Sequence, residues 1–122
     1  MNTIEIKSKV IEDVGVIYPG LYLNQLRGEL IEERCHEMLA QSVRRIVINF
    51  EETELVNSIG ISILLGVIEA VNEMSGELIL SNLNASNREL FDMLGLFSYV
   101  RVEDFEEHAL AKLQEHPELV TS

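Results

Sequence analysis

Residues 3–9 alternate between apolar and polar positions, and together with an apolar run that follows a turn signal they predict a β-hairpin. Over residues 3–9, two isoleucines fall on one face and charged residues fall on the other, which is typical of a half-buried strand near a sheet edge. Glu12-Asp13 is a turn signal, and the apolar run Val14–Tyr18 predicts the second strand. Pro19-Gly20 then ends the hairpin.

The period changes to three and four over the next segment, which predicts an amphipathic helix from about Asn24 to Gln41. Glutamates occupy the face opposite to the apolar one. A nearly continuous apolar run, Ile46–Phe50, follows and suits an interior strand that is covered on both faces. The apolar positions of the helical segment are Leu23, Leu26, Leu30, Ile31, Met38 and Leu39.

A second helix is predicted from about Ser58 to Ser75-Gly76, and it is apolar on nearly all sides, so we expect most of it to be buried. Ser58 stands where an N-cap is expected, and Gly76 suits the C′ position just after the helix. Glu77–Ser81 predicts a further strand.

The remaining residues predict two shorter helices and a weak strand. Asn84 or Ser86 can cap the first helix, and Gly95 ends it. Residues 99–102 predict the weak strand, and Asp104 is the expected cap of the last helix.

The predicted order of elements is therefore ββαβαβα(β)α. Strands that alternate with helices form an α/β fold whose inner strands are parallel and whose helices pack against the sheet. We expect a mixed sheet of four to five strands with about four packed helices. Residues 1–122 contain no linker or repeat and have the length of one domain, so we expect a single domain.

Composition narrows the classes of function. The net charge of −12 argues against binding a nucleic-acid backbone or an anionic membrane surface. No apolar run approaches the roughly 20 residues of a membrane span, and the N-terminus lacks a signal-peptide core, so we expect a soluble cytoplasmic protein. A single cysteine excludes an internal disulfide framework, and the histidines lack metal-ligand spacing, so we expect no metal and no cofactor.

No set of residues indicates catalysis. Glycine-rich phosphate loops and a Ser-His-Asp set are absent from the sequence. Cys35 has acidic neighbours, which would raise its thiol pKa, so a nucleophile is not expected there. Phe91, Phe97 and Tyr99 are expected in the core. We therefore expect that the chain is not an enzyme.

The richest candidate site is the loop Glu51–Gly60, because ligands of open α/β sheets favour the carboxyl ends of strands. Two interpretations of Ser58 stay open. Ser58 caps its helix while Gly60 lets backbone approach closely, or Ser58 accepts a phosphate. A phosphate there would lie at the positive end of a helix dipole and beside three glutamates of the loop, where it would repel an acidic partner surface.

These residues resemble the STAS family, named for sulfate transporters and anti-sigma factor antagonists. Residues 46–50 and 55–65 are similar to its central signature, in which an apolar strand precedes Asp-Ser-Ser/Thr-Gly and an apolar helix. The resemblance covers nearly the whole chain. Further similar segments follow in the family's order at Tyr18–Asn24, Gly76–Leu78, Asn87–Phe97 and Glu106–Leu110.

The resemblance implies a function. Bacterial stand-alone members capture an anti-sigma factor that is also a serine kinase of the GHKL type, with a nucleotide bound by the kinase. Phosphorylation of the first Ser of the signature abolishes capture, and a PP2C-type phosphatase reverses it; that Ser corresponds to Ser58. Asn49, Asn57 and Ile59 replace two Asp and one Ser/Thr of the family pattern. The partner-binding residues that the resemblance implies are Asn24, Asn57, Ser58, Ile59, Gly60 and Ser62.

Three hypotheses remain. The first is a phosphorylation-switched anti-sigma factor antagonist that regulates transcription through protein–protein interaction. The second keeps the fold but makes the domain a constitutive scaffold in a regulatory or transport assembly. The third is a small-molecule binder or enzyme that uses the same loop.

Overall fold

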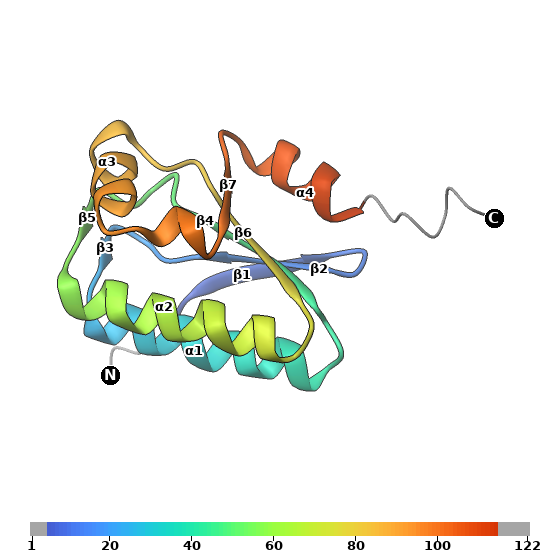
Figure 1. Cartoon of the computed structure of the whole chain (residues 1–122). Coiled ribbons are helices and arrows are strands. Elements are labelled where there is room, and N and C mark those ends of the chain that lie inside the picture. Colours follow the sequence, from blue (N-terminus) through green and yellow to red (C-terminus); the bar gives the residue numbers. More distant parts are fainter. Residues whose placement is uncertain (1–4, 115–122) are drawn as a thin grey trace.

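A five-stranded mixed sheet forms the centre of the computed structural model, which describes residues 5–114 (Figure 1). Its strands stand in the order β1-β2-β4-β6-β7, with β1 antiparallel to β2 and the other neighbours parallel. The predicted mixed sheet with parallel inner strands is therefore confirmed. The strands are β1 Lys7–Ile11, β2 Val14–Tyr18, β4 Arg45–Asn49, β6 Glu77–Ser81 and β7 Arg101–Glu103.

Helices cover both faces of this sheet. α1 and α2 run side by side along one face and begin at the same end of the molecule, whereas α4 lies on the opposite face (Figure 1). The helices are α1 Gln25–Ala40, α2 Ser58–Glu73, α3 Ala85–Met93 and α4 Glu106–Gln114, with a short 3₁₀ helix at Leu96–Ser98.

A second, two-stranded parallel sheet pairs β3 (Tyr22–Leu23) with β5 (Leu55–Val56). Hydrophobic periodicity did not predict it, because strands of two residues show no period. β3 directly precedes α1, and β5 directly precedes α2. Their pairing therefore fixes the first turns of these two helices next to each other.

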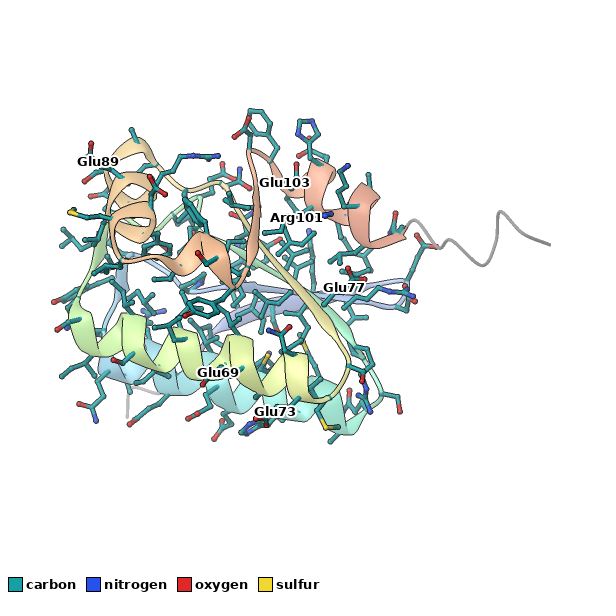
Figure 2. The ribbon with its side chains drawn as sticks, viewed as in Figure 1. Glu69, Glu73, Glu77, Glu89, Arg101 and Glu103 are labelled. Atoms are coloured by element: carbon teal, nitrogen blue, oxygen red, sulfur yellow. The ribbon has the colours of Figure 1, made fainter. Side chains whose placement is uncertain are left out.

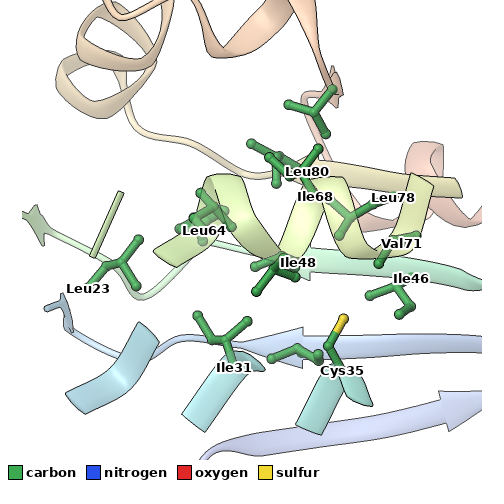
Figure 3. Close-up of a cluster of buried hydrophobic side chains, with 14 of the residues drawn as sticks. Leu23, Ile31, Cys35, Ile46, Ile48, Leu64, Ile68, Val71, Leu78 and Leu80 are labelled. Atoms are coloured by element: carbon green, nitrogen blue, oxygen red, sulfur yellow. The ribbon is translucent and has the colours of Figure 1, made fainter. Parts of the chain in front are cut away.

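The core is divided by the sheet. The larger part lies between the sheet and α1 and α2 (Figure 3). The smaller part joins Val16, Val47 and Ile79 to Ala109 and Leu113 of α4. Because β4 contacts both parts, its residues 46–48 are fully buried on both faces, which explains the unbroken apolar run in the sequence.

The outer surface of the helical layer carries much of the negative charge. Glu69 and Glu73 point away from the sheet along α2 (Figure 2). Glu33 and Glu37 are likewise exposed on α1. These carboxylates lie on solvated helix faces.

The first strand is displaced along the chain from its predicted position. It runs over Lys7–Ile11 instead of residues 3–9, because the Glu12-Asp13 turn pairs Ile11 with Val14 and so extends the strand up to the turn. Residues 3 and 4 of the prediction lie outside the described residues. The last strand is also displaced, and Tyr99, expected in the core, is 66% exposed.

The ends of α3 are as the sequence predicts. Asn84 is the N-cap, and its Oδ1 accepts a hydrogen bond from the Asn87 backbone N–H at 2.7 Å. After the helix, Gly95 has a φ of +80°, which suits glycine.

The predicted ends of α2 and α4 need correction. Ser75, with a φ of +60°, takes the left-handed position after α2. Gly76 instead allows close approach, because a Cβ there would lie 2.5 Å from the Arg44 carbonyl oxygen. α4 begins at Glu106, so Asp104 lies too early to cap it, and its carboxylate contacts Arg88 at 3.4 Å.

Candidate functional site

Ser58 is the first residue of α2, and its side chain is exposed. The N-cap is Asn57, whose Oδ1 accepts a hydrogen bond from the Gly60 backbone N–H at 2.8 Å. The prediction that Ser58 caps the helix is therefore wrong, since Asn, an equally good cap residue, stands one position earlier. Capping does not require the Ser58 hydroxyl, which leaves this side chain available for another role.

Gly60 brings the first turn of α2 against β3. The residue is buried, and a Cβ at this position would collide with the carbonyl oxygen of Leu23. The Asn57 backbone N–H donates to the same carbonyl oxygen at 3.0 Å. This contact confirms the expectation that Gly60 permits close approach of backbone.

Asn24 and Asn57 are equivalent caps of neighbouring helices. The Oδ1 atom of Asn24 accepts from the Arg27 backbone N–H at 3.0 Å. Each asparagine directly follows one strand of the two-stranded sheet, in which Leu23 pairs with Val56. Two neutral caps therefore lie at the same end of the molecule, which the sequence spacing alone did not show.

A groove of about 430 Å³ separates the N-terminal half of α2 from α3 and the 3₁₀ helix. Ser58 and Ser62 contribute its hydroxyl groups, and the other walls are mostly apolar. Ile59, on the neighbouring face of the same turn, is 51% exposed. The groove is lined by Val56, Asn57, Ser58, Ile61, Ser62, Leu65, Leu90, Leu94 and Leu96.

Large apolar side chains surround this end of the molecule without being buried. Leu55 is 58% exposed, and Leu26, which its spacing assigned to the buried face of α1, is 46% exposed. Exposed apolar side chains that gather at one end of a molecule make that end a candidate surface for protein–protein interaction. The set, called the apolar rim below, is Leu21, Tyr22, Leu26, Leu55, Ile59, Met93 and Leu94.

The acidic loop that precedes β5 is held firmly at its centre. Thr53 is buried; its Oγ1 donates to the Gly20 carbonyl oxygen at 2.6 Å, and its own carbonyl accepts from Asn87 Nδ2 at 3.1 Å. The flanking Glu52 and Glu54 are exposed. The loop therefore presents its carboxylates from a fixed backbone.

Residues 5–114 show no sign of metal binding, of a reactive thiol or of a membrane-spanning helix. This part of the chain holds no group of three or more His, Cys, Asp or Glu side chains that could bind a metal ion. Burial raises the pKa of the Cys35 thiol to about 12, so burial, and not the acidic neighbours invoked from the sequence, suppresses its reactivity. Across the same residues, the helices are too short or too polar to span a membrane.

These features define an α/β domain with a mixed sheet and two parallel helices on one face. An exposed serine begins one of these helices, α2. The STAS domain family model matches residues 5–109, so the chain belongs to the STAS family.

Several proteins of known name are similar to the chain. The anti-sigma F factor antagonist of Paenibacillus polymyxa is 26% identical over 103 residues, which cover 78% of this chain and 88% of that protein. A solved anti-sigma factor antagonist from Mycobacterium paratuberculosis superposes with a TM-score of 0.79 at 18% identity, over 93% of this chain and 96% of the other.

The Bacillus cell fate determinant SpoIIAA is similar in two solved forms, both 23% identical to the chain. The unphosphorylated form gives a TM-score of 0.72 over 91% of this chain and 99% of the other. The phosphorylated form gives 0.70 over 89% and 99%. At these identities the structural likenesses establish the fold, and they confirm the predicted STAS-like architecture.

Proposed function

We propose that the chain is an anti-sigma factor antagonist: it binds an anti-sigma factor and so regulates transcription indirectly. The observation that carries this proposal is the exposed Ser58 at the start of α2, bordered by the groove and the apolar rim. The similarity to an anti-sigma F factor antagonist supports the choice of partner. The chain acts as a binding module and not as a catalyst, within one domain of residues 1–122 in the cytoplasm.

The site residues divide between contact and positioning. Ser58, Ile59 and Ser62 are exposed and face the partner. Gly60 is buried, so it acts by holding the first turn of α2 against β3. Asn24 and Asn57 act chiefly as caps that fix the two helix N-termini at the docking surface.

Phosphorylation of Ser58 is the switch that we propose, and the anti-sigma factor is itself the kinase, of the GHKL type with its own bound nucleotide. A phosphate adds roughly −1.5 to −2 charges at the positive end of the α2 dipole, which tolerates them. The described first turn of α2 holds no acidic residue. The phosphate therefore leaves the fold intact and acts by repelling the docked partner.

The kinase supplies the catalytic base for phosphoryl transfer, because the residue before Ser58 is the amide Asn57 and not a carboxylate. A PP2C-type phosphatase then removes the phosphate and restores capture. This chain contributes the acceptor hydroxyl and its position only.

Mass spectrometry after incubation with ATP and the kinase-type anti-sigma factor encoded in the same genome tests the switch. We expect one phosphate on Ser58 and loss of the complex, with Ser58→Asp failing to bind. Ser86→Asp is the matched control, since Ser86 is also an exposed serine in the first turn of a helix, and this variant should bind the anti-sigma factor normally. A phosphate elsewhere together with normal binding by Ser58→Asp would refute the switch.

The same experiment separates the other functions. A complex that persists whatever the ATP concentration identifies a constitutive scaffold in a regulatory or transport assembly. Absence of any complex, with thermal stabilisation by a metabolite, identifies a small-molecule binder that uses the groove.

A further inference from the structure

A partly buried polar contact joins β4 to α4 on the sheet face opposite to α1 and α2. Asn49, the last residue of β4, is 4% exposed, and its Nδ2 donates to Oε1 of Glu106 at 2.9 Å. Glu106 is the first residue of α4. The same carboxylate accepts from the Tyr18 hydroxyl at 2.7 Å and pairs with Lys9 Nζ at 3.0 Å. Glu106 therefore has two donors on Oε1 and the Lys9 ammonium on Oε2.

The other end of the Asn49 amide reaches the loop that leads to Ser58. Its Oδ1 accepts from the Glu51 backbone N–H at 2.7 Å, which shapes the first turn of the loop. Two residues later, Thr53 is bound to Gly20 and Asn87 as described above. The hydrogen bonds thus run continuously from α4 through Asn49 into the loop.

The chemistry of the two side chains fixes the orientation of Asn49. An ionised carboxylate only accepts hydrogen bonds, so it must face the Nδ2 end of the amide. The Oδ1 end then necessarily points to the Glu51 N–H. A flipped amide would set Oδ1 against the carboxylate and Nδ2 against an N–H, which leaves two mismatched polar contacts.

We propose that Glu106 is a positioning residue for the phosphorylation site: by orienting the Asn49 amide, it sets the loop that carries Ser58. The effect on phosphorylation rests on the proposed function, whereas the effect on the loop does not. α4 is thereby part of the machinery of a site on the other side of the sheet.

The ionised state of Glu106 agrees with this role. Burial by itself raises the pKa of the carboxyl group, but the hydrogen bonds from Asn49, Tyr18 and Lys9 outweigh burial and hold its pKa below the ordinary value. The carboxylate is thus the acceptor near neutral pH.

The test is an exchange of the two side chains. Glu106→Gln makes the orienting group neutral, and Asn49→Asp sets two carboxylates against each other; both should weaken the Glu51 N–H hydrogen bond. In the double variant, the Gln amide donates to one Asp oxygen while the other Asp oxygen accepts from Glu51, so the contact is restored. Tyr18→Phe is the matched control, because it removes another hydrogen bond to Glu106 Oε1 without altering Asn49.

The first measurement is hydrogen exchange and the NMR shift of the Glu51 and Ser58 amides in the isolated protein. We expect the protection of the Glu51 amide to fall several-fold in each single variant, because its hydrogen bond to residue 49 is weakened. The double variant and Tyr18→Phe should keep it. If Glu106→Gln alters Glu51 no more than Tyr18→Phe does, or if the double variant does not recover, the proposal is overturned.

The second measurement is the rate of Ser58 phosphorylation by the anti-sigma factor kinase. We expect Glu106→Gln to raise KM or lower kcat several-fold, and the double variant to recover, while Tyr18→Phe stays at the wild-type rate. An unchanged rate in Glu106→Gln with altered Glu51 protection would overturn the link to Ser58. Failure of the wild type to be phosphorylated refutes the proposed phosphorylation switch instead, and the amide measurement still decides whether Glu106 positions the loop.

Discussion

Replacing Gly60 by alanine tests the contact that seats α2 on β3. A Cβ at Gly60 would meet the Leu23 carbonyl oxygen, with its carbon at 2.8 Å and the Leu23 Cγ at 3.0 Å. Real Cβ atoms do not approach other atoms that closely, and the obstacle is mainly backbone, which cannot rotate away. The first turn of α2 must therefore move off β3 and strain the Asn57-to-Leu23 hydrogen bond.

The expected cost follows from two opposing effects. Overpacking of a tight site costs about 1–3 kcal/mol, and a backbone obstacle places Gly60→Ala near ~3 kcal/mol. Alanine in a helix is favoured over glycine by about 1 kcal/mol. We therefore expect the free energy of unfolding to fall by roughly 2 kcal/mol.

Gly66 of the same helix is the matched control, because a Cβ there would meet nothing within 4 Å. Gly66→Ala should show the propensity gain alone and stabilise the protein by about 1 kcal/mol. Urea unfolding measures both variants. With an m-value of about 1.5 kcal/mol/M, the midpoint should fall by about 1.3 M for Gly60→Ala and rise by about 0.7 M for Gly66→Ala.

The difference between the two variants cancels the propensity effect and isolates the collision with Leu23. Unfolding free energies that agree within about 0.5 kcal/mol would refute the close contact. An unchanged midpoint with a changed m-value would instead indicate a change in the unfolded or native ensemble.

Three further predictions concern other parts of the fold. Leu64→Ala should lower the free energy of unfolding by about 2–5 kcal/mol, as measured by urea unfolding, whereas Leu65→Ala, at a partly buried position, should lower it clearly less. Equal decreases in the two variants would contradict the burial pattern of α2. Asn57→Ala should cost about 1 kcal/mol through loss of the cap, and Asn57→Asp should restore it. The Glu106 carboxyl has a pKa below its ordinary 4.5, so it stabilises the fold above that pH and loses this effect on acidification. Glu106→Gln should therefore lower the free energy of unfolding at pH 7. In urea unfolding at acidic pH, the difference in free energy between this variant and the wild type should be smaller.

The central sheet was predicted well because the residue composition of its strands reflects how each strand is buried. The unbroken apolar run of β4 indicated a strand covered on both faces, and the structure confirms it. Asn84 and Gly95 likewise marked the ends of α3 through local chemistry. The strands and helix ends whose structure is determined by their own side chains were therefore predictable.

The surroundings of Ser58 were predictable only in part. The loop was predicted as a candidate site from its place after a strand, but the N-cap of α2 was assigned one residue too late. The apolar rim was missed, because the exposure of Leu26 depends on where β3 and β5 hold the helix ends. Such features depend on contacts between distant segments, which no local pattern encodes.

The small β3–β5 sheet has a consequence for how the chain folds. Its pairing joins Tyr22 to Leu55, 33 positions later, so it forms only after a long loop has closed. Closure brings together the two halves of the chain that supply the first turns of α1 and α2. A nascent or partly unfolded chain therefore lacks the assembled surface around Ser58, which forms only when the two halves of the chain have come together.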